Sequence, residues 1–324
     1  MNASAVWTGS EFIVWGGSVG RTPFVDGAAY DPRTRTWRAV PAAPIAPRTQ
    51  HAAVWTGREM LVVGGTSRRG NAATFADGAA YDPAAGTWRR IADAPAVTAA
   101  GKAVVVGGFV VVSGREGPTP DPRHLLVYDL AADRWTAVPA GVEVADLAAA
   151  GSGVAVAGRQ ARFAFVAIPD GSVQLLPDLP LRRHELLDLQ YAVAWTGSEV
   201  LAFAGRDHTV VGAWRPGRRS WSATTTVRSD HLQVRSGDNW HEAGAVAWHR
   251  GWVVSAGISN FYAAAPATGL SAALSEAVRR LCPGDAAIAF SDDAVFVWGG
   301  TECHPGPNLT GAMGAGTLIR LESR

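Results

Sequence analysis

Lysine is almost missing from this chain: among its 29 basic residues only Lys102 is a lysine. Charged residues make up only 18% of the 324 residues, and the formal net charge is +1. This balance argues against a nucleic-acid-binding protein, because phosphate binding needs a basic face. The chain has no uninterrupted apolar run of about 18 residues, so we expect no membrane-spanning helix. Hydrophobic residues still reach 48%, which allows a large core and excludes global disorder.

The first residues lack the charged start and apolar run of a secretory leader. Two locations follow from this absence. The protein is cytoplasmic, or it is extracytoplasmic and its leader is not part of this sequence. The composition favours turns and strands, with 37 Gly, 19 Pro and 13 Trp.

An internal repeat runs along nearly the whole chain. The string Ala-Val-Trp-Thr-Gly occurs at 5–9 and 53–57, and a third copy, Ala-Trp-Thr-Gly, occurs at 194–197. Each string begins an apolar segment that ends in glycine. Seven such glycines follow one another at spacings of 43 to 52 residues: Gly17, Gly65, Gly114, Gly158, Gly205, Gly257 and Gly300.

A second string, Ala-Ala-Tyr-Asp-Pro, occurs at 28–32 and 79–83, and a tryptophan follows each copy at Trp37 and Trp88. The combination of a Gly-Gly strand, a Tyr-Asp strand and a Trp strand resembles the kelch repeat of β-propellers. The resemblance implies an all-β, seven-bladed β-propeller of four-stranded antiparallel blades. The sequence supports this fold independently of the resemblance. Each repeat holds four short β runs, and the sheet that they form cannot bury both of its faces unless neighbouring blades pack against it.

We therefore predict one β-propeller domain over residues 1–324. The last blade shows only three strand-like runs. Either this blade has three strands, which would leave its outer edge open, or the chain is trimmed. Residues 270–281 have helical spacing, and we expect a short helix there in place of an outer strand. The predicted blades are 3–44, 51–95, 100–140, 143–180, 188–228, 243–281 and 285–321.

The two faces of such a propeller differ in chemistry. With strands labelled a to d from the axis outward, the a–b and c–d turns are short and rich in Gly, Asp and Pro. We expect these turns to be too short to form a pocket wall. The b–c loops and the d-to-a connections carry most of the histidines, with arginines and carboxylates, as expected for a ligand-binding mouth.

The candidate residues on that loop face converge on the axis, because every inner strand starts there. An Arg or His just before an inner strand also commonly hydrogen-bonds the adjacent blade, and this structural role is favoured for Arg48 and His51. The candidate catalytic groups are His51, His184, Glu185, His241 and Glu242. The candidate ligand-binding groups are Arg48, Gln50, Arg183, His208, His231, Arg235, Asp238 and Trp240.

The two cysteines flank the inner strands of the last blade. Cys282 precedes one strand and Cys303 follows its antiparallel neighbour, so both should emerge on the same face within disulfide reach. A disulfide would indicate an oxidising compartment. Two free thiols, or a metal bound by these cysteines and His304, are the alternatives. No CxxC or HxxxH spacing supports a metal, and we expect no metal and no cofactor.

Two functions fit these residues. The first is a binding module that recognises a glycan, small molecule or protein at the axial funnel on the loop face. The alternative is a lyase, epimerase or isomerase that uses acid–base chemistry on a small, sugar-acid-like substrate in the same funnel. In the enzyme, Arg48 or Arg235 would hold a substrate carboxylate. We expect a monomer with no nucleic-acid partner.

Overall fold

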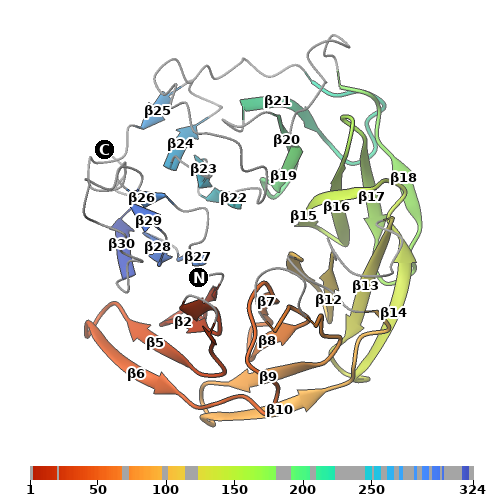
Figure 1. Cartoon of the computed structure of the whole chain (residues 1–324). Coiled ribbons are helices and arrows are strands. Elements are labelled where there is room, and N and C mark those ends of the chain that lie inside the picture. Colours follow the sequence, from red (N-terminus) through yellow and green to blue (C-terminus); the bar gives the residue numbers. More distant parts are fainter. Residues whose placement is uncertain are drawn as a thin grey trace. The chain divides into compact units, whose positions relative to one another are not determined.

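The computed structural model has an all-β fold, and its described residues form antiparallel sheets joined by turns and loops (Figure 1). The chain divides into two compact units. Unit 1 contains Met1–Pro139, Asp285–Gly300 and Ala312–Arg324, and unit 2 contains Ala140–Gly284 and Thr301–Gly311. The structure describes residues 3–19, 22–67, 73–96, 101–113, 123–179, 191–204, 209–222, 245–249, 252–256, 261–265, 270–272, 281–282, 287–291, 294–299, 301–302 and 316–320.

Unit 1 contains three four-stranded sheets and one three-stranded sheet, all antiparallel. A two-stranded hairpin of β3 (Ser18–Val19) and β4 (Thr22–Pro23) lies in the first b–c connection. The first sheet has β1 (Ser4–Trp7), β2 (Phe12–Trp15), β5 (Gly27–Asp31) and β6 (Thr36–Val40). The second has β7 (Ala52–Trp55), β8 (Met60–Val63), β9 (Gly78–Asp82) and β10 (Thr87–Ile91). The third has β11 (Ala103–Val106), β12 (Phe109–Val112), β13 (His124–Asp129) and β14 (Arg134–Pro139). The last sheet has β27 (Ala287–Phe290), β28 (Ala294–Trp298) and β30 (Gly316–Arg320).

Unit 2 is built in the same way. Its four-stranded sheets are β15 (Val144–Ala150), β16 (Gly153–Gly158), β17 (Phe163–Ala167) and β18 (Val173–Leu175), and β22 (Ala245–His249), β23 (Trp252–Ala256), β24 (Phe261–Ala265) and β25 (Leu270–Ala272). A three-stranded sheet has β19 (Tyr191–Trp195), β20 (Val200–Ala204) and β21 (Thr209–Trp214), and a small pair joins β26 (Leu281–Cys282) to β29 (Thr301–Glu302).

Two details differ from the prediction. In the described part of the fifth blade, the outer strand is reduced to a single bridge between Ala213 and Ser222. The exposed segment 215–220, Arg-Pro-Gly-Arg-Arg-Ser, takes up the turn before this bridge. The helix expected over 270–281 begins instead as the outer strand β25, because Leu270–Ala272 pairs with β24. The remaining residues of that segment, 273–280, lie outside the described residues.

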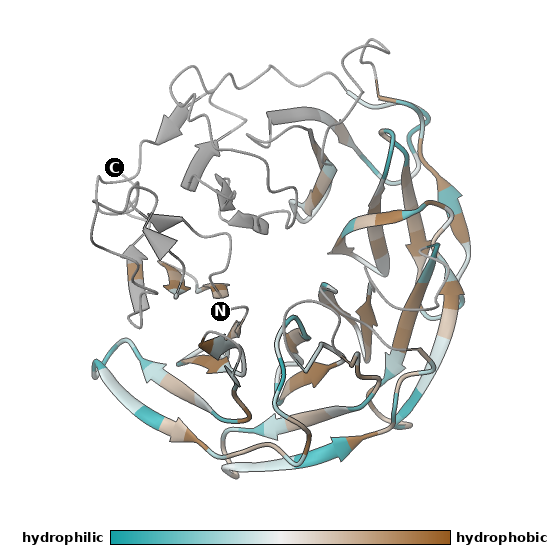
Figure 2. Ribbon diagram, in the orientation of Figure 1, coloured by the Kyte–Doolittle hydropathy of each residue, from teal (hydrophilic) through white to brown (hydrophobic). Residues whose placement is uncertain are grey.

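The second strand of each described blade in unit 1 forms the centre of the packing. All four residues of β8 are fully buried, and β2 and β12 are nearly so. Figure 2 shows these inner strands as apolar and the outer strands β6 and β10 as more hydrophilic. Each buried large apolar side chain stabilises the fold by roughly 1.5–3 kcal/mol.

The glycine ladder has a steric cause. Gly65 has a φ of +95°, and an added Cβ would lie 2.6 Å from the Thr49 carbonyl oxygen. A larger residue would therefore clash with the connection that leads into β7.

Tryptophans at the outer strands tie the second, third and fifth blades to the blades before them. The Nε1 group of Trp88 donates to the Pro41 carbonyl at 2.9 Å, and that of Trp135 donates to the Ala92 carbonyl at 2.8 Å. In unit 2, Trp221 donates to the Pro177 carbonyl at 2.6 Å. Each acceptor follows the outer strand of the preceding sheet, so the indole joins two blades while its ring packs between them.

Candidate functional site

Arg48, a predicted ligand-binding residue, lies in the connection between β6 and β7 and is completely buried. Its guanidinium donates to the carbonyls of Ala46, Gly64 and Asp77 at 2.9, 2.9 and 3.2 Å. The same group lies 4.4 Å from the centre of the Phe75 ring. These bonds attach the connection to the second blade and give the buried Arg48 side chain a structural role.

The charge of Arg48 is balanced by Asp77. Nη2 donates to Oδ2 at 3.1 Å, and Nη1 lies 2.8 Å from Oδ1 in a charge contact without hydrogen-bond alignment. Burial would raise the pKa of Asp77, but the hydrogen bonds and charges of Arg48 and Arg90 outweigh burial and lower it. The carboxylate is therefore ionised at neutral pH and holds the buried guanidinium in place.

His51 lies at the start of β7 and is 7% exposed. Its Nε2 is 2.6 Å from the Ser4 Oγ, and its ring meets the Trp15 ring edge-on at 4.9 Å between centres. Among the described residues, Nδ1 has no hydrogen-bond partner. Burial and the positive charge of Arg48 lower the pKa of His51 to about 3, so the ring is neutral at pH 7.

Gln50 lies between these two residues in a left-handed conformation, with a φ of 55°. Its Oε1 accepts a hydrogen bond from the Thr66 hydroxyl at 3.3 Å. The side chain is half-buried, so it is more accessible than its two neighbours. The structure thus brings Arg48, Gln50 and His51 together, and it uses the first and last of them to join blades.

The other predicted site residues lie outside the described residues, so their placement stays a prediction. They are Arg183, His184, Glu185, His208, His231, Arg235, Asp238, Trp240, His241 and Glu242. Cys282 lies in β26 and pairs with Thr301 of β29. Thr301 lies two residues before Cys303 in the chain. Cys303 also lies outside the described residues, so the disulfide stays a prediction as well.

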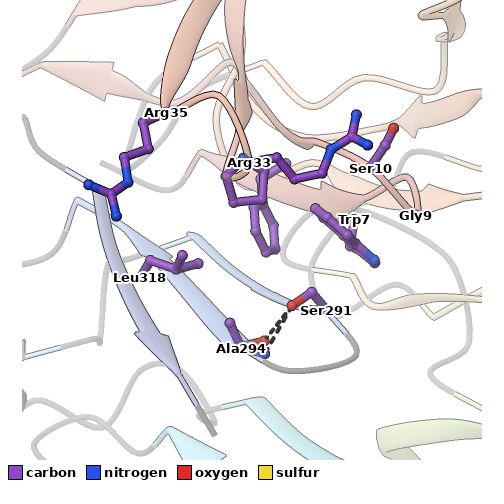
Figure 3. Close-up of a pocket in the computed structure, with 10 residues that line it drawn as sticks. Trp7, Gly9, Ser10, Arg33, Arg35, Ser291, Ala294 and Leu318 are labelled. Atoms are coloured by element: carbon purple, nitrogen blue, oxygen red, sulfur yellow. Dashed lines mark hydrogen bonds between the residues drawn. The ribbon is translucent and has the colours of Figure 1, made fainter.

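A pocket of about 420 Å³ lies in unit 1 on the face made by the a–b and c–d turns (Figure 3). Trp7, Phe12 and Leu318 form its apolar part, and Arg33 and Arg35 lie at its edge. The expectation that these turns could not form a pocket wall was therefore wrong. Adjacent turns combine across a blade junction, although each is short by itself. Sequence reasoning missed this site, although the two turn arginines after Pro32 were a visible signal.

A second pocket of about 650 Å³ lies on the same face between the first and second sheets. Two ion pairs line it. Arg38 Nε donates to Glu11 at 3.0 Å, and Arg58 lies 3.3 Å from Asp82. Because each charge already has a partner, this pocket offers less unbalanced charge than the one beside Arg33 and Arg35.

The comparisons with known proteins agree with this architecture. The profile of the KLHDC2/KLHL20/DRC7 Kelch-repeats domain matches residues 1–162, which is half of the 324 residues. The chain belongs to the kelch-repeat family. No curated protein is similar enough in sequence to match this kelch chain.

The solved structure of YjhT, a bacterial kelch propeller, is 12% identical in sequence to this kelch chain. The match has a TM-score of 0.56 and covers 98% of this chain and 94% of YjhT. At this identity the likeness shows the fold alone, which is the kelch propeller fold. The solved chains that match number 1016, so the fold by itself does not indicate a ligand.

Within the described part of the chain, no helix is long and apolar enough to span a membrane. The described residues also contain no group of three or more His, Cys, Asp or Glu side chains placed to hold a metal ion.

Proposed function

We propose that this kelch propeller is a binding module. It recognises a glycan, small molecule or protein through the b–c and d–a loops around the axial funnel. The observation that carries this proposal is the role of Arg48 and His51. Both were candidates for chemistry at the funnel, and both are buried and used to join blades.

The acid–base alternative depended partly on these two groups. A general acid or base needs a pKa near the working pH, and the pKa of His51 is about 3. A residue that holds a substrate carboxylate must reach the substrate, and Arg48 is fully buried with its donors already bonded to protein acceptors. Neither Arg48 nor His51 therefore supports the acid–base alternative.

The experiment is a thermal-shift screen of the full chain against monosaccharides, sugar acids and short peptides, followed by titration calorimetry of each hit. Changing both His241 and Glu242 to alanine should weaken binding by at least about tenfold, equal to about 1.4 kcal/mol. The matched control is His249→Ala, in β22, which should bind as the wild type does.

Two results would count against the proposal. The first is a double variant that binds as tightly as the wild type while the control loses binding, because the site would then lie on the other face. The second is the conversion of a bound sugar acid to a new product, as detected by nuclear magnetic resonance. The protein would then be an enzyme.

A further inference from the structure

Within the described residues, the last sheet of unit 1 ends at β30 and has no fourth strand. Among the described residues, β28 pairs with β27 on one side and β30 on the other, and no strand pairs with the far side of β30. The three other large sheets of this unit each carry a fourth strand in the equivalent position: β6, β10 and β14. Unpaired N–H and C=O groups along an edge favour the addition of another strand.

The complete blades show what the missing strand does. The carbonyl that follows β6 accepts the hydrogen bond of Trp88, and the carbonyl that follows β10 accepts that of Trp135. Trp37 is the corresponding residue of the first blade, since it pairs with Tyr30 as Trp88 pairs with Tyr81. Its indole has no such acceptor among the described residues.

Trp37 is 43% exposed, although it packs against Trp298 and Tyr30 at 4.9 Å between ring centres in each case. The corresponding Trp88 and Trp135 are half-buried, so Trp37 is the most exposed of the three. Its ring is packed on one side by tilted aromatic contacts, and its Nε1 has no acceptor among the described residues.

The described residues also lack a second hydrogen bond between the last sheet of unit 1 and the first sheet. In the first blade, Glu11 holds Arg38, whose Nη1 donates to the hydroxyl of Tyr81 in the next blade at 2.9 Å. Ala294 takes the place of Glu11, because Ser291 N donates to Ala294 O as Thr8 N donates to Glu11 O. The Tyr30 hydroxyl makes no hydrogen bond to a described residue.

The space left at the junction is the pocket of about 420 Å³. Figure 3 shows Arg33 on the Trp7 side of the pocket and Arg35 on the Leu318 side. The Arg33 side chain is 79% exposed and lies 3.7 Å from Asp31, its one described ion-pair partner. Arg35 has no ion pair with a described residue. The described lining thus carries two positive charges and no carboxylate.

We propose that the outer edge of β30 binds an extended, acidic segment of a partner protein as a fourth strand. The segment pairs antiparallel to β30, as every outer strand of unit 1 pairs with its neighbour. One of its carbonyls accepts the hydrogen bond of Trp37, and its carboxylates meet Arg33 and Arg35. Backbone bonds give affinity in this mode of recognition, and side-chain pockets give specificity. This site lies outside the loop face of the proposed function.

The test uses three labelled peptides and the full chain, with binding followed by fluorescence anisotropy. The first peptide has two glutamates followed by alternating threonine and valine. The second has lysines in place of the glutamates, and the third is the first with every second backbone nitrogen methylated, which blocks strand pairing. The glutamate peptide should bind at least about tenfold more tightly than either control.

Protein variants locate the contacts. Changing Arg33 and Arg35 together to glutamate should abolish the preference for the glutamate peptide. Trp37→Phe keeps an aromatic ring but loses the donor, so it should weaken binding by several-fold. The matched control is Trp88→Phe, whose acceptor is Pro41 within the fold, and it should leave peptide binding unchanged. The double change of His241 and Glu242 to alanine should also leave peptide binding unchanged, which separates this site from the proposed loop-face site.

Several outcomes would overturn the proposal. Equal binding of the glutamate and lysine peptides would reject the charge match, and equal binding of the methylated peptide would reject strand pairing. Protection from hydrogen exchange in the free monomer, at the β30 amides that point away from β28, would mean that a segment of this chain already pairs with the outer edge. Dimerisation that the peptide reverses would make a second copy the occupant.

One sequence feature needs its own variant. Asp292 and Asp293 lie between Ser291 and Ala294 and are outside the described residues. If the glutamate peptide binds only after both are changed to asparagine, the site does not select an acidic segment in the natural chain.

Discussion

Mild acid should destabilise the fold through His51. The ring is buried beside Arg48, and both features lower its pKa to about 3 from an ordinary value of 6.5. Below pH 6.5 the unfolded chain binds a proton at this residue while the folded chain does not. The free energy of unfolding therefore decreases as the pH falls below 6.5 and increases again as the pH rises.

The size of this effect follows from the two pKa values. Once the ring is fully protonated in the unfolded chain, each further unit by which the pH falls toward 3 lowers the free energy of unfolding by about 1.4 kcal/mol. Lowering the pH from 7 to 5 should therefore cost about 2 kcal/mol through His51, and lowering it to 3 should cost about 4 kcal/mol.

The assay compares the wild type with His51→Gln, whose amide can still bond the Ser4 hydroxyl but does not titrate. Urea unfolding followed by tryptophan fluorescence gives the free energy of unfolding of each protein at pH 7, 6 and 5. The other seven of the eight histidines are common to both proteins, so their contribution cancels in the difference. The stability advantage of the wild type should shrink by about 2 kcal/mol between pH 7 and 5. A difference that stays constant over this range would refute the argument that His51 is neutral and buried.

Two further predictions concern the buried ion pair and the cysteines. Arg48→Met should lower the free energy of unfolding by about 3–5 kcal/mol, because it leaves buried carbonyls without a donor and removes the buried partner of the Asp77 carboxylate. Arg90→Met removes the exposed partner of the same carboxylate and should cost less than about 1 kcal/mol, so equal losses in urea unfolding would contradict the buried role of Arg48. Thiol titration of unfolded, unreduced protein should find no reactive thiol at Cys282 or Cys303 and two after reduction. Two thiols before reduction would rule out the disulfide.

The sequence alone predicted the strands because their signals are local. The Ala-Ala-Tyr-Asp-Pro string contains both a strand and the turn that ends it, and Tyr30, Tyr81 and Tyr128 pair with the expected tryptophans. The helix predicted over 270–281 is wrong at its first residues, because Leu270–Ala272 pairs along β24. Arrangement of all seven blades as one domain around one axis stays a prediction.

Local signals could not decide what each polar side chain does. Arg48 and Arg33 look alike in the sequence, since both follow proline in a connection between strands. Only the packing of β8 and β9 against the connection buries Arg48 among three carbonyls and Asp77, whereas Arg33 stays in solvent at the edge of a pocket. The repeat therefore determined the strands and their partners through short-range periodicity. Tertiary structure decided which charges are buried and which face solvent, because burial depends on residues that are distant in the chain.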